Sequence, residues 1–533
     1  MTGRFRFAIT VAGLMAAATP VAGQATAYVQ QQDAAYTDLD VLIAAGLVRN
    51  VIAGERPYSR AAFRRFVDEA RSRAGAAAVS SRIVEAIERL GARFAGAEPA
   101  TRRLSLTSAE ARLALAASPY RPHRMGDTTD AGSPLDADLN PLLLGTEARR
   151  FADGGTASVE AGLELGSRFF AAQVVPRVSL FVPHSGFSGY ATLVNAYGRF
   201  QVGPAALDIG RNSRSVGHGL AGGAMLSRNS PGLDMVRVAF DRPVRLPLFL
   251  DALGLWQASI GVADLGDGQD QPGSVLTHMR LSGRPSAFGE FGITYFNIQG
   301  GHGSPPSDWA GRIHDLFFFW SDGGFLTISD KVAGVDMRLF LPSRRASVNV
   351  NFLTTDDRGR FTQPARGYWE DAVWQAGADI AGLGPEGRTD LAIEWAHAGP
   401  RAHTHGQFTS GVTLRRRVLG NALGPNASGV TVLVTENKPT SRLRVTGAWE
   451  RYSGDDWFWA LIPGGAPWDY DWFRAADNPD EIRVRILSEY VRERGWRGME
   501  TSIRLGYEHV TRFNYGTTGR HNLVADVALR YAR

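Results

Sequence analysis

Aromatic and acidic side chains gather in one late stretch of the chain, residues 454–480. The six that we single out are Asp455, Trp457, Trp459, Trp468, Asp469 and Trp472. Flat apolar rings beside fixed hydrogen-bonding groups suit a sugar, which has an apolar CH face and a polar edge. We therefore predict a carbohydrate-binding loop here. The alternative interpretation is that the tryptophans pack on one another at the rim of a larger structure.

A second group of candidate binding residues lies in residues 207–233, a segment rich in Gly, Ser, Asn and Arg. Its members are Arg211, Arg214, His218, Arg228 and Asn229. Arginine presents a planar fork of donors to carboxylates and phosphates, so this segment is suited to an acidic polymer. The alternative is that these arginines pair with neighbouring acidic side chains.

Catalytic and metal chemistry have weaker support. Carboxylates within 454–480 resemble a glycosidase pair, but chance proximity explains them better. His403 and His405 offer a weak metal site, and calcium could bind a set of four aspartates, namely Asp455, Asp456, Asp469 and Asp471. We predict no catalytic residue, no bound metal and no cofactor, and the glycine-rich stretches match no phosphate-binding loop.

The elements that must position these residues alternate with a period of two from about residue 104 onward. The last segment is the clearest, because Leu523, Val527 and Tyr531 face one way while Asn522 and Asp526 face the other. Such alternation indicates strands with one apolar face. We estimate about 18 strands of about ten residues, the length that a tilted strand needs to cross a bilayer. We predict a mainly β protein, with a transmembrane antiparallel barrel over residues 104–533.

A soluble sandwich would show the same period, so the export signal, strand number and strand length decide between the two folds. Closure of the sheet is required in lipid, since an open edge leaves backbone groups without partners. Such barrels often end on an aromatic residue, whereas this chain ends Tyr531-Ala532-Arg533. Aromatic residues near strand ends suit interfacial girdles, and they include Phe169, Phe170, Trp256, Trp395 and Trp449.

Residues 28–103 show helical periodicity instead. Thr37 and Asp40 resemble a capping box for a first helix that Gly46 can end, and Ser59 and Ser81 can cap two more helices. Three short amphipathic helices can bury their apolar faces in a small bundle. We predict a structural or docking domain that lies in the periplasm.

The N-terminus has the features of an export signal, which we place at residues 1–27. Arg4 and Arg6 precede an apolar run, and Ala25-Thr26-Ala27 forms an A-x-A cleavage pattern that competes with Val21-Ala22-Gly23. The chain has no cysteine, so disulfides and thiolate sites are excluded. Its formal net charge is +5, but basic and acidic residues alternate rather than cluster, which argues against nucleic-acid binding.

Two blocks of sequence resemble the capsule assembly Wzi family of outer-membrane proteins. The first contains Ile209-Gly210-Arg211, Gly217-His218-Gly219 and the run from Met225 to Gly232. The second runs from Phe408 to Arg417 and continues through Leu419-Gly420 to Leu423-Gly424-Pro425-Asn426. Where the family has a Trp-Gly-Pro-Gly-like element, this chain has Val216-Gly217-His218-Gly219. The order of signal, helical domain and long barrel also agrees.

The resemblance implies a non-enzymatic surface lectin that holds capsular or other exopolysaccharide at the outer membrane of a Gram-negative-type bacterium. Its expected partners are that polysaccharide and outer-membrane lipid, including lipopolysaccharide, and we expect a monomer. A porin-like channel for small solutes or glycans is the alternative function, suggested by the polar inward face of the strands. An outer-membrane enzyme is a third possibility that no group of residues supports.

Overall fold

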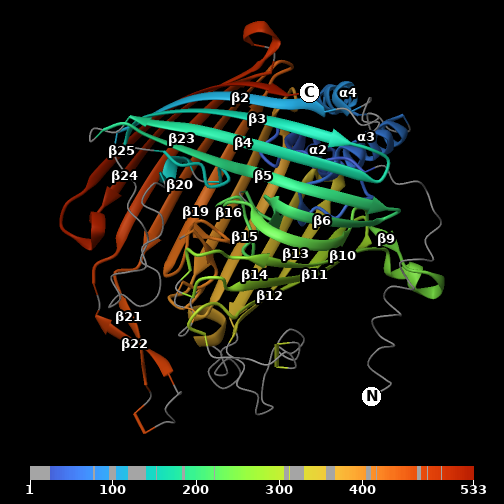
Figure 1. Ribbon diagram of the computed structural model, residues 1–533. Helices are drawn as coiled ribbons and strands as arrows, with labels where there is room; N and C mark the ends of the chain where they lie inside the picture. The colour runs from blue at the N-terminus through green and yellow to red at the C-terminus, as the bar shows by residue number, and fades with distance from the viewer. Residues whose placement is uncertain are drawn as a thin grey trace, which may run out of the picture.

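A closed antiparallel β-barrel forms most of the molecule (Figure 1). The computed structural model describes residues 25–75, 79–94, 104–117, 140–143, 145–151, 153–182, 186–220, 222–269, 271–304, 311–312, 329–355, 366–403, 408, 410–415, 417–461, 463–464, 470–476, 478–493 and 495–532. Residues 1–24 of the export signal predicted for residues 1–27 therefore lie outside the described residues, whereas residues 25–27 lie within them. Within them the barrel has 18 strands, which confirms the predicted fold class.

Each strand of the wall pairs antiparallel with its neighbours in the chain. The strands are β2 (Leu104–Ala116), β3 (Gly154–Gly166), β4 (Phe170–Val182), β5 (Ser188–Val202), β6 (Ala205–Asn212), β8 (Leu233–Phe240), β10 (Leu255–Asp264), β11 (Val275–Ser286), β12 (Gly289–Gln299), β13 (Ser329–Leu341), β14 (Ala346–Thr355), β15 (Ala372–Leu383), β16 (Thr389–Ala398), β19 (Ala427–Asn437), β20 (Ser441–Tyr452), β23 (Glu481–Arg492), β24 (Glu500–Thr511) and β25 (Arg520–Ala532). The two-residue β9 (Val244–Arg245) also pairs with β10.

The barrel closes where the last strand meets the first. β25 pairs with β2 in a register that sets Arg530 opposite Glu110 and Tyr531 opposite Ala109. This pairing leaves no free sheet edge, so the backbone donors and acceptors of both strands are satisfied.

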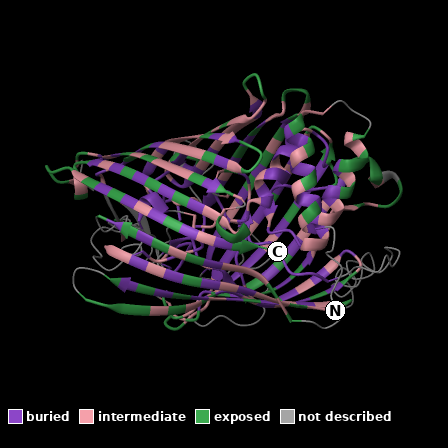
Figure 2. Ribbon diagram, turned by 90° about the horizontal axis from the view of Figure 1, so that it is seen from above, coloured by how far each residue is buried: buried purple, intermediate pink, exposed green. Residues whose placement is uncertain are grey.

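The two faces of the wall have opposite character. Leu113 and Leu505 on the outside are 65% and 60% exposed, whereas Arg199 and Asp526 on the inside are 0% and 1% exposed. Figure 2 shows the resulting alternation of buried and exposed residues along the strands. The apolar-out, polar-in arrangement predicted for a barrel in lipid is confirmed.

Three helices precede the barrel: α2 (Ala35–Ala44), α3 (Arg60–Ala74) and α4 (Ser81–Phe94). Ser59 caps α3, because its hydroxyl accepts a hydrogen bond of 3.2 Å from the Ala62 amide. The predicted capping box at Thr37 is wrong, since α2 begins two residues earlier and its N-cap, Ala34, makes no side-chain hydrogen bond. Gly46 follows α2 with a φ of +71°, the left-handed conformation expected after a helix end.

The helices pack through their apolar faces and also onto the barrel. Leu39, Phe63, Leu90 and Phe94 belong to one buried cluster, which includes Phe340 from β13. The helices therefore dock against the wall instead of forming a detached bundle. None of the helices among the described residues has the length and apolarity needed to cross a membrane.

The helices and the connection between β20 and β23 mark opposite ends of the barrel (Figure 1). We call the end with α2, α3 and α4 the helical end. At the other end β21 (Asp456–Leu461) and β22 (Tyr470–Ala476) form a hairpin that projects beyond the strands, and we call it the hairpin end.

Candidate functional site: a plugged lumen and a projecting hairpin

The interior of the barrel is crossed by several segments that pair with one another, which we call the plug. They are the described residues within 25–34, 45–59, 140–151, 213–232 and 399–426. β1 (Glu55–Arg56) pairs with β7 (Ser215–Val216), and the Gly217 amide donates to the Gly54 carbonyl at 2.9 Å. Thus the polar insertion found in the sequence folds into the lumen and joins the N-terminal stretch there.

The insertion also bonds to the later loop of the plug. The Ser227 amide donates to the Leu419 carbonyl at 2.7 Å, and the Asn229 side chain donates to the Val418 carbonyl at 3.0 Å. Predicted binding residue Asn229 is 4% exposed, so its side chain serves the internal structure of the plug.

Buried ion pairs fasten the plug to one side of the wall. Arg214 donates to Glu55 at 2.9 Å, and Arg237 from β8 makes a second, shorter ion pair with Glu55. Burial would raise the pKa of Glu55, but the guanidinium groups of Arg237 and Arg214 hold it well below its ordinary value. Predicted binding residue Arg214 therefore belongs to a luminal ion-pair lattice, which was the alternative interpretation for this arginine-rich segment.

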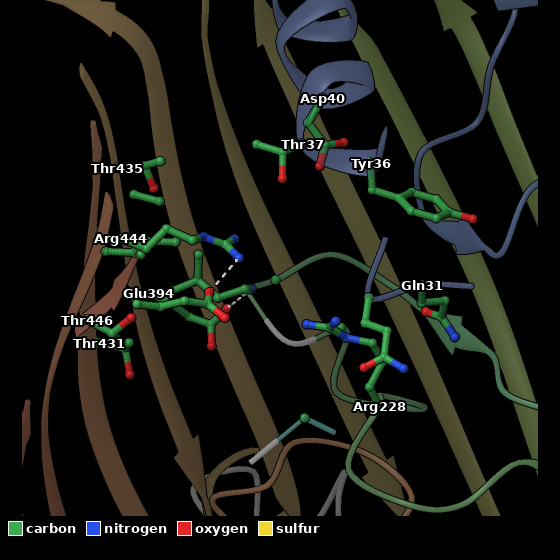
Figure 3. A pocket seen from close by; sticks show the side chains of 18 of the residues that line it. Gln31, Tyr36, Thr37, Asp40, Arg228, Glu394, Thr431, Thr435, Arg444 and Thr446 are labelled. Carbon is green, nitrogen blue, oxygen red and sulfur yellow. Dashed lines mark hydrogen bonds and ion pairs between the residues drawn. The ribbon is translucent and has the colours of Figure 1, made fainter. Parts of the chain in front are cut away.

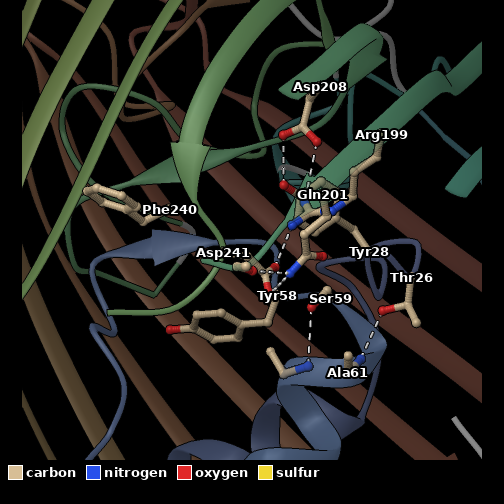
Figure 4. Close-up of polar contacts among 12 residues, drawn as sticks. Thr26, Tyr28, Tyr58, Ser59, Ala61, Arg199, Gln201, Asp208, Phe240 and Asp241 are labelled. Carbon is tan, nitrogen blue, oxygen red and sulfur yellow. Dashed lines mark hydrogen bonds and ion pairs between the residues drawn. The ribbon is translucent and has the colours of Figure 1, made fainter. Parts of the chain in front are cut away.

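A second carboxylate extends this lattice, as Figure 4 shows. Asp208 from β6 accepts hydrogen bonds from the Tyr28 hydroxyl at 2.7 Å, from Arg199 at 3.3 Å and from Arg237 at 3.1 Å. Arg199 also pairs with Asp241 at 2.5 Å. The N-terminal stretch is thus held by charges on the strands that surround it.

His218 lies deep in the same region. Its Nε2 is 3.3 Å from a carboxylate oxygen of Glu290 and 3.3 Å from one of Asp336, and its backbone exchanges two hydrogen bonds with the Asn351 side chain. Gly217 beside it has a φ of +92°, and a Cβ there would lie 2.4 Å from Asn351. The glycine allows this close approach, and His218 positions the plug against β12, β13 and β14.

Arg211 differs from the other arginines of the insertion because it lies on the outer phase of β6. It pairs with Asp234, whose side chain is 50% exposed. Arg211 donates hydrogen bonds to both carboxylate oxygens of Asp234. No sequence pattern separated Arg211 from Arg214, yet Arg211 points to the outside of the wall and Arg214 lies in the lumen.

A cavity of about 590 Å³ remains inside the barrel between α2, the plug and the opposite wall; we call it the chamber. Inward positions of β15, β19 and β20 are small here, and they include Gly377, Thr431 and Thr446. Arg228 from the plug and Arg444 from β20 both line the chamber (Figure 3). Arg444 was not singled out in the sequence, although its phase in a strand with an apolar outer face predicts that it points inward.

The hairpin carries the aromatic and acidic residues predicted to contact sugar. In register, Trp459 of β21 lies opposite Trp472 of β22, and Trp457 lies opposite Arg474. Asp455 accepts a hydrogen bond from Arg474 at 2.7 Å. Trp468 and Asp469 fall outside the described residues.

Metal chemistry finds no support among the residues that the structure describes, where no group of three or more His, Asp or Glu side chains is arranged to hold an ion. His403 is 0% exposed, and burial lowers its pKa to about 4. His405 and Asp469 lie outside the described residues.

Comparison with known proteins gives one family and a set of similar folds. The family model of the capsule assembly protein Wzi matches residues 137–443. No curated protein matches the sequence.

Among solved structures, Wzi of Escherichia coli, an outer membrane protein involved in group 1 capsule assembly and described as a carbohydrate-binding β-barrel, matches with a TM-score of 0.67 at 14% identity, covering 96% of this chain and 100% of the other. The outer membrane protein OprD of Pseudomonas aeruginosa matches with a TM-score of 0.41 at 9% identity, covering 81% of this chain and 95% of the other.

Proposed function

Because the chain belongs to the capsule assembly protein Wzi family, we propose that it binds capsular or another exopolysaccharide and anchors it at the cell surface without catalysis. The observation that carries this proposal is the hairpin, which projects from the barrel and sets Trp459 opposite Trp472. The carbohydrate-binding character of the E. coli barrel, a neighbour in fold, points the same way.

The proposal orients the protein in the outer membrane. The helical end, with α2, α3 and α4 of the predicted domain 28–103, faces the periplasm, and the hairpin end faces the outside. The stretches of that domain on either side of α2 enter the lumen as part of the plug. The exposed apolar belt contacts outer-membrane lipid, including lipopolysaccharide, and a single chain suffices because the barrel closes on itself.

The roles of the candidate residues follow from their places. Trp457, Trp459, Trp468 and Trp472 would stack on sugar rings, and Asp455 and Asp469 would accept hydrogen bonds from hydroxyl groups. Arg214, His218 and Asn229 would instead hold the plug, which keeps the hairpin end rigid.

The experiment replaces Trp459 and Trp472 by alanine in the native strain and separates cell-bound from released polysaccharide. We expect most of the bound polymer to appear in the medium, since aromatic stacking on each sugar is lost. Trp496→Ala is the matched control, because Trp496 is 58% exposed but lies in the β23–β24 turn at the helical end. Unchanged retention in the double variant, with normal barrel folding, would contradict the proposal.

A porin-like channel remains the alternative, and the chamber is the observation in its favour. The plug separates the chamber from much of the hairpin end, so we expect little steady conductance. Recordings in planar bilayers test this, and a large steady conductance of the native protein would favour the channel.

A further inference from the structure

Arg228 is the arginine of the chamber that stands apart from the ion-pair lattice. Among the described residues it forms no ion pair and no side-chain hydrogen bond, whereas the other arginines of the chamber, such as Arg338 with Asp379 at 3.1 Å, have carboxylate partners. Arginine stays protonated in proteins, so the chamber contains a cation without a bonded counter-charge. Such a group is costly to bury.

The acidic side chain that interacts most with Arg228 is Glu147, and it does not bond to the guanidinium group. Glu147 donates its backbone amide to the Arg228 carbonyl at 3.0 Å, but no ion pair forms between the two side chains. Burial, followed by the negative charge of Glu160, raises the pKa of Glu147. The charges of Arg177 and Arg228 act in the opposite direction and lower it. Arg228 thus interacts with the charge of Glu147 only at a distance, and it has no bonded counter-charge among the described residues.

Arg444 adds a second guanidinium on the facing wall (Figure 3). Its partner, Glu489, is 3.5 Å away, at the long end of the range for a hydrogen-bonded ion pair. Glu394 also lines the cavity, but its carboxylate accepts hydrogen bonds from the Leu220 amide and from Gln375, each at 2.8 Å. Arg228 and Arg444 therefore line one cavity with donors left over, and guanidinium groups of this kind bind a carboxylate or phosphate group.

Hydroxyl side chains complete the chamber. Thr431, Thr435 and Thr446 line the same wall as Arg444, and each hydroxyl can both donate and accept a hydrogen bond. The volume of about 590 Å³ falls in the range of small-molecule sites. An ion alone would leave most of this volume and these hydroxyls unused, whereas a sugar ring with an acidic substituent would use them.

We propose that the chamber binds one acidic sugar unit, with its carboxylate between Arg228 and Arg444 and its hydroxyls on the threonines. The source of that sugar, an acidic polysaccharide, rests on the proposed function. The site itself does not, because its geometry is independent of the hairpin.

The test is isothermal titration of the folded protein in detergent with sodium D-glucuronate, with D-glucose and inorganic phosphate in separate arms. We expect saturable binding of glucuronate and at least tenfold weaker binding of glucose and phosphate. Arg228→Gln should weaken glucuronate at least tenfold, and Arg228→Lys should weaken it less. Arg211→Gln is the matched control on the outer face and should leave binding unchanged.

Several results would overturn the chamber site: no glucuronate binding, equal affinity in Arg228→Gln, or phosphate binding as tight as glucuronate. Circular dichroism and the heat-dependent gel shift of each variant establish that it folds. If Arg228→Gln does not fold, Thr431→Leu replaces it, since filling the chamber must also abolish binding. The hairpin variants separate the two proposals, because they should lose polymer but keep glucuronate.

A second inference concerns processing and rests on the first described residues. Ala25 is 0% exposed and its amide donates to the Arg168 carbonyl at 3.1 Å. Thr26 accepts a hydrogen bond of 2.9 Å from the Ala61 amide in the first turn of α3 (Figure 4). Cleavage after Ala27 would remove both contacts and leave a charged amine at Tyr28, whose amide is buried against the Tyr197 hydroxyl.

We infer that export processing occurs before Ala25, as the Val21-Ala22-Gly23 pattern allows. Intact mass and N-terminal sequencing of the protein purified from outer membranes test this. We expect a first residue at or before Gln24, and a first residue at Tyr28 would overturn the inference.

Discussion

The two sides of the lumen use the same residue type in different ways. On the side where the N-terminal stretch lies, Arg214 and Arg237 both pair with Glu55, and side chains fill the lumen. We call this the filled side. Across the chamber, small inward residues such as Gly377 and Thr431 leave a cavity in which Arg228 lacks an ion pair among the described residues. The difference teaches that arginines of the lumen are neutralised where a carboxylate of the plug or of the wall reaches them. Arg228, which has no such ion pair among the described residues, remains able to bind a ligand.

Removal of Glu55 should have the largest effect, because it breaks the filled side at its centre. Glu55→Ala leaves Arg214 and Arg237 without this partner, and we expect a loss of about 3–5 kcal/mol in the free energy of unfolding. Urea unfolding in detergent, followed by tryptophan fluorescence, measures it. Glu386→Ala is the control, since its side chain is 82% exposed beside Arg388. Equal stability of the two variants would show that the lattice is not what holds the plug.

Acid should weaken the filled side next. Asp241 pairs with Arg199 and with Arg65 of α3; burial raises its pKa, but these arginines lower it to about 2. The folded pKa lies below the unfolded one, so the stabilisation is present above about pH 4 and is lost as the pH falls toward 2. The shift corresponds to about 2 kcal/mol. The difference between the unfolding free energies at pH 5 and at pH 2.5 should be smaller in Asp241→Asn than in the native protein. An equal difference in the two proteins would refute the assignment.

A larger side chain should destabilise the filled side more than the chamber, because the chamber has free volume. Ser282 on β11 is 0% exposed, and its hydroxyl has no hydrogen-bond partner within the part of the chain that the structure describes. Ser282→Leu therefore overpacks the filled side without breaking a bond and should cost about 1–3 kcal/mol. Thr431→Leu enters the chamber and should cost less than about 1 kcal/mol. The same unfolding measurement compares them, and an equal cost would mean that the chamber is as tightly packed as the rest.

The smallest expected effect has the opposite sign. Arg228→Gln removes the guanidinium that has no ion pair among the described residues, and we expect a gain of about 1 kcal/mol without ligand. Arg214→Gln, its counterpart on the filled side, should lose stability. A loss in Arg228→Gln would indicate that a partner already compensates its charge.

The strands of the wall and the three helices could be predicted from the sequence because both depend on local periodicity. The alternation of β25 predicted which of its side chains face lipid, and the Ser59 cap followed from residue type and position. The start of α2 was missed because Ala34 caps it without a side-chain bond, so no residue type marks the boundary.

The lattice could not be predicted, because its members are far apart in the chain. Glu55 and Arg237 are separated by 182 residues, and no local pattern distinguishes that glutamate from an exposed one. Arg211 and Arg214 were grouped because they are three residues apart. Strand β6 ends at Asn212 between them, so the two guanidinium groups lie on opposite sides of the wall.

The seam between β2 and β25 has a consequence for the order of assembly. The parts of the stretch from Ala25 to Ser59 that flank α2 lie within a cylinder that the last strand completes, so they must enter before the final register of β25 against β2 is set. This order agrees with export of the chain from its N-terminus, which delivers the plug before β25. If the barrel closed first, the plug could not enter the lumen. We therefore expect variants with a broken ion-pair lattice to accumulate during insertion, either as barrels without the plug or with β2 and β25 unpaired.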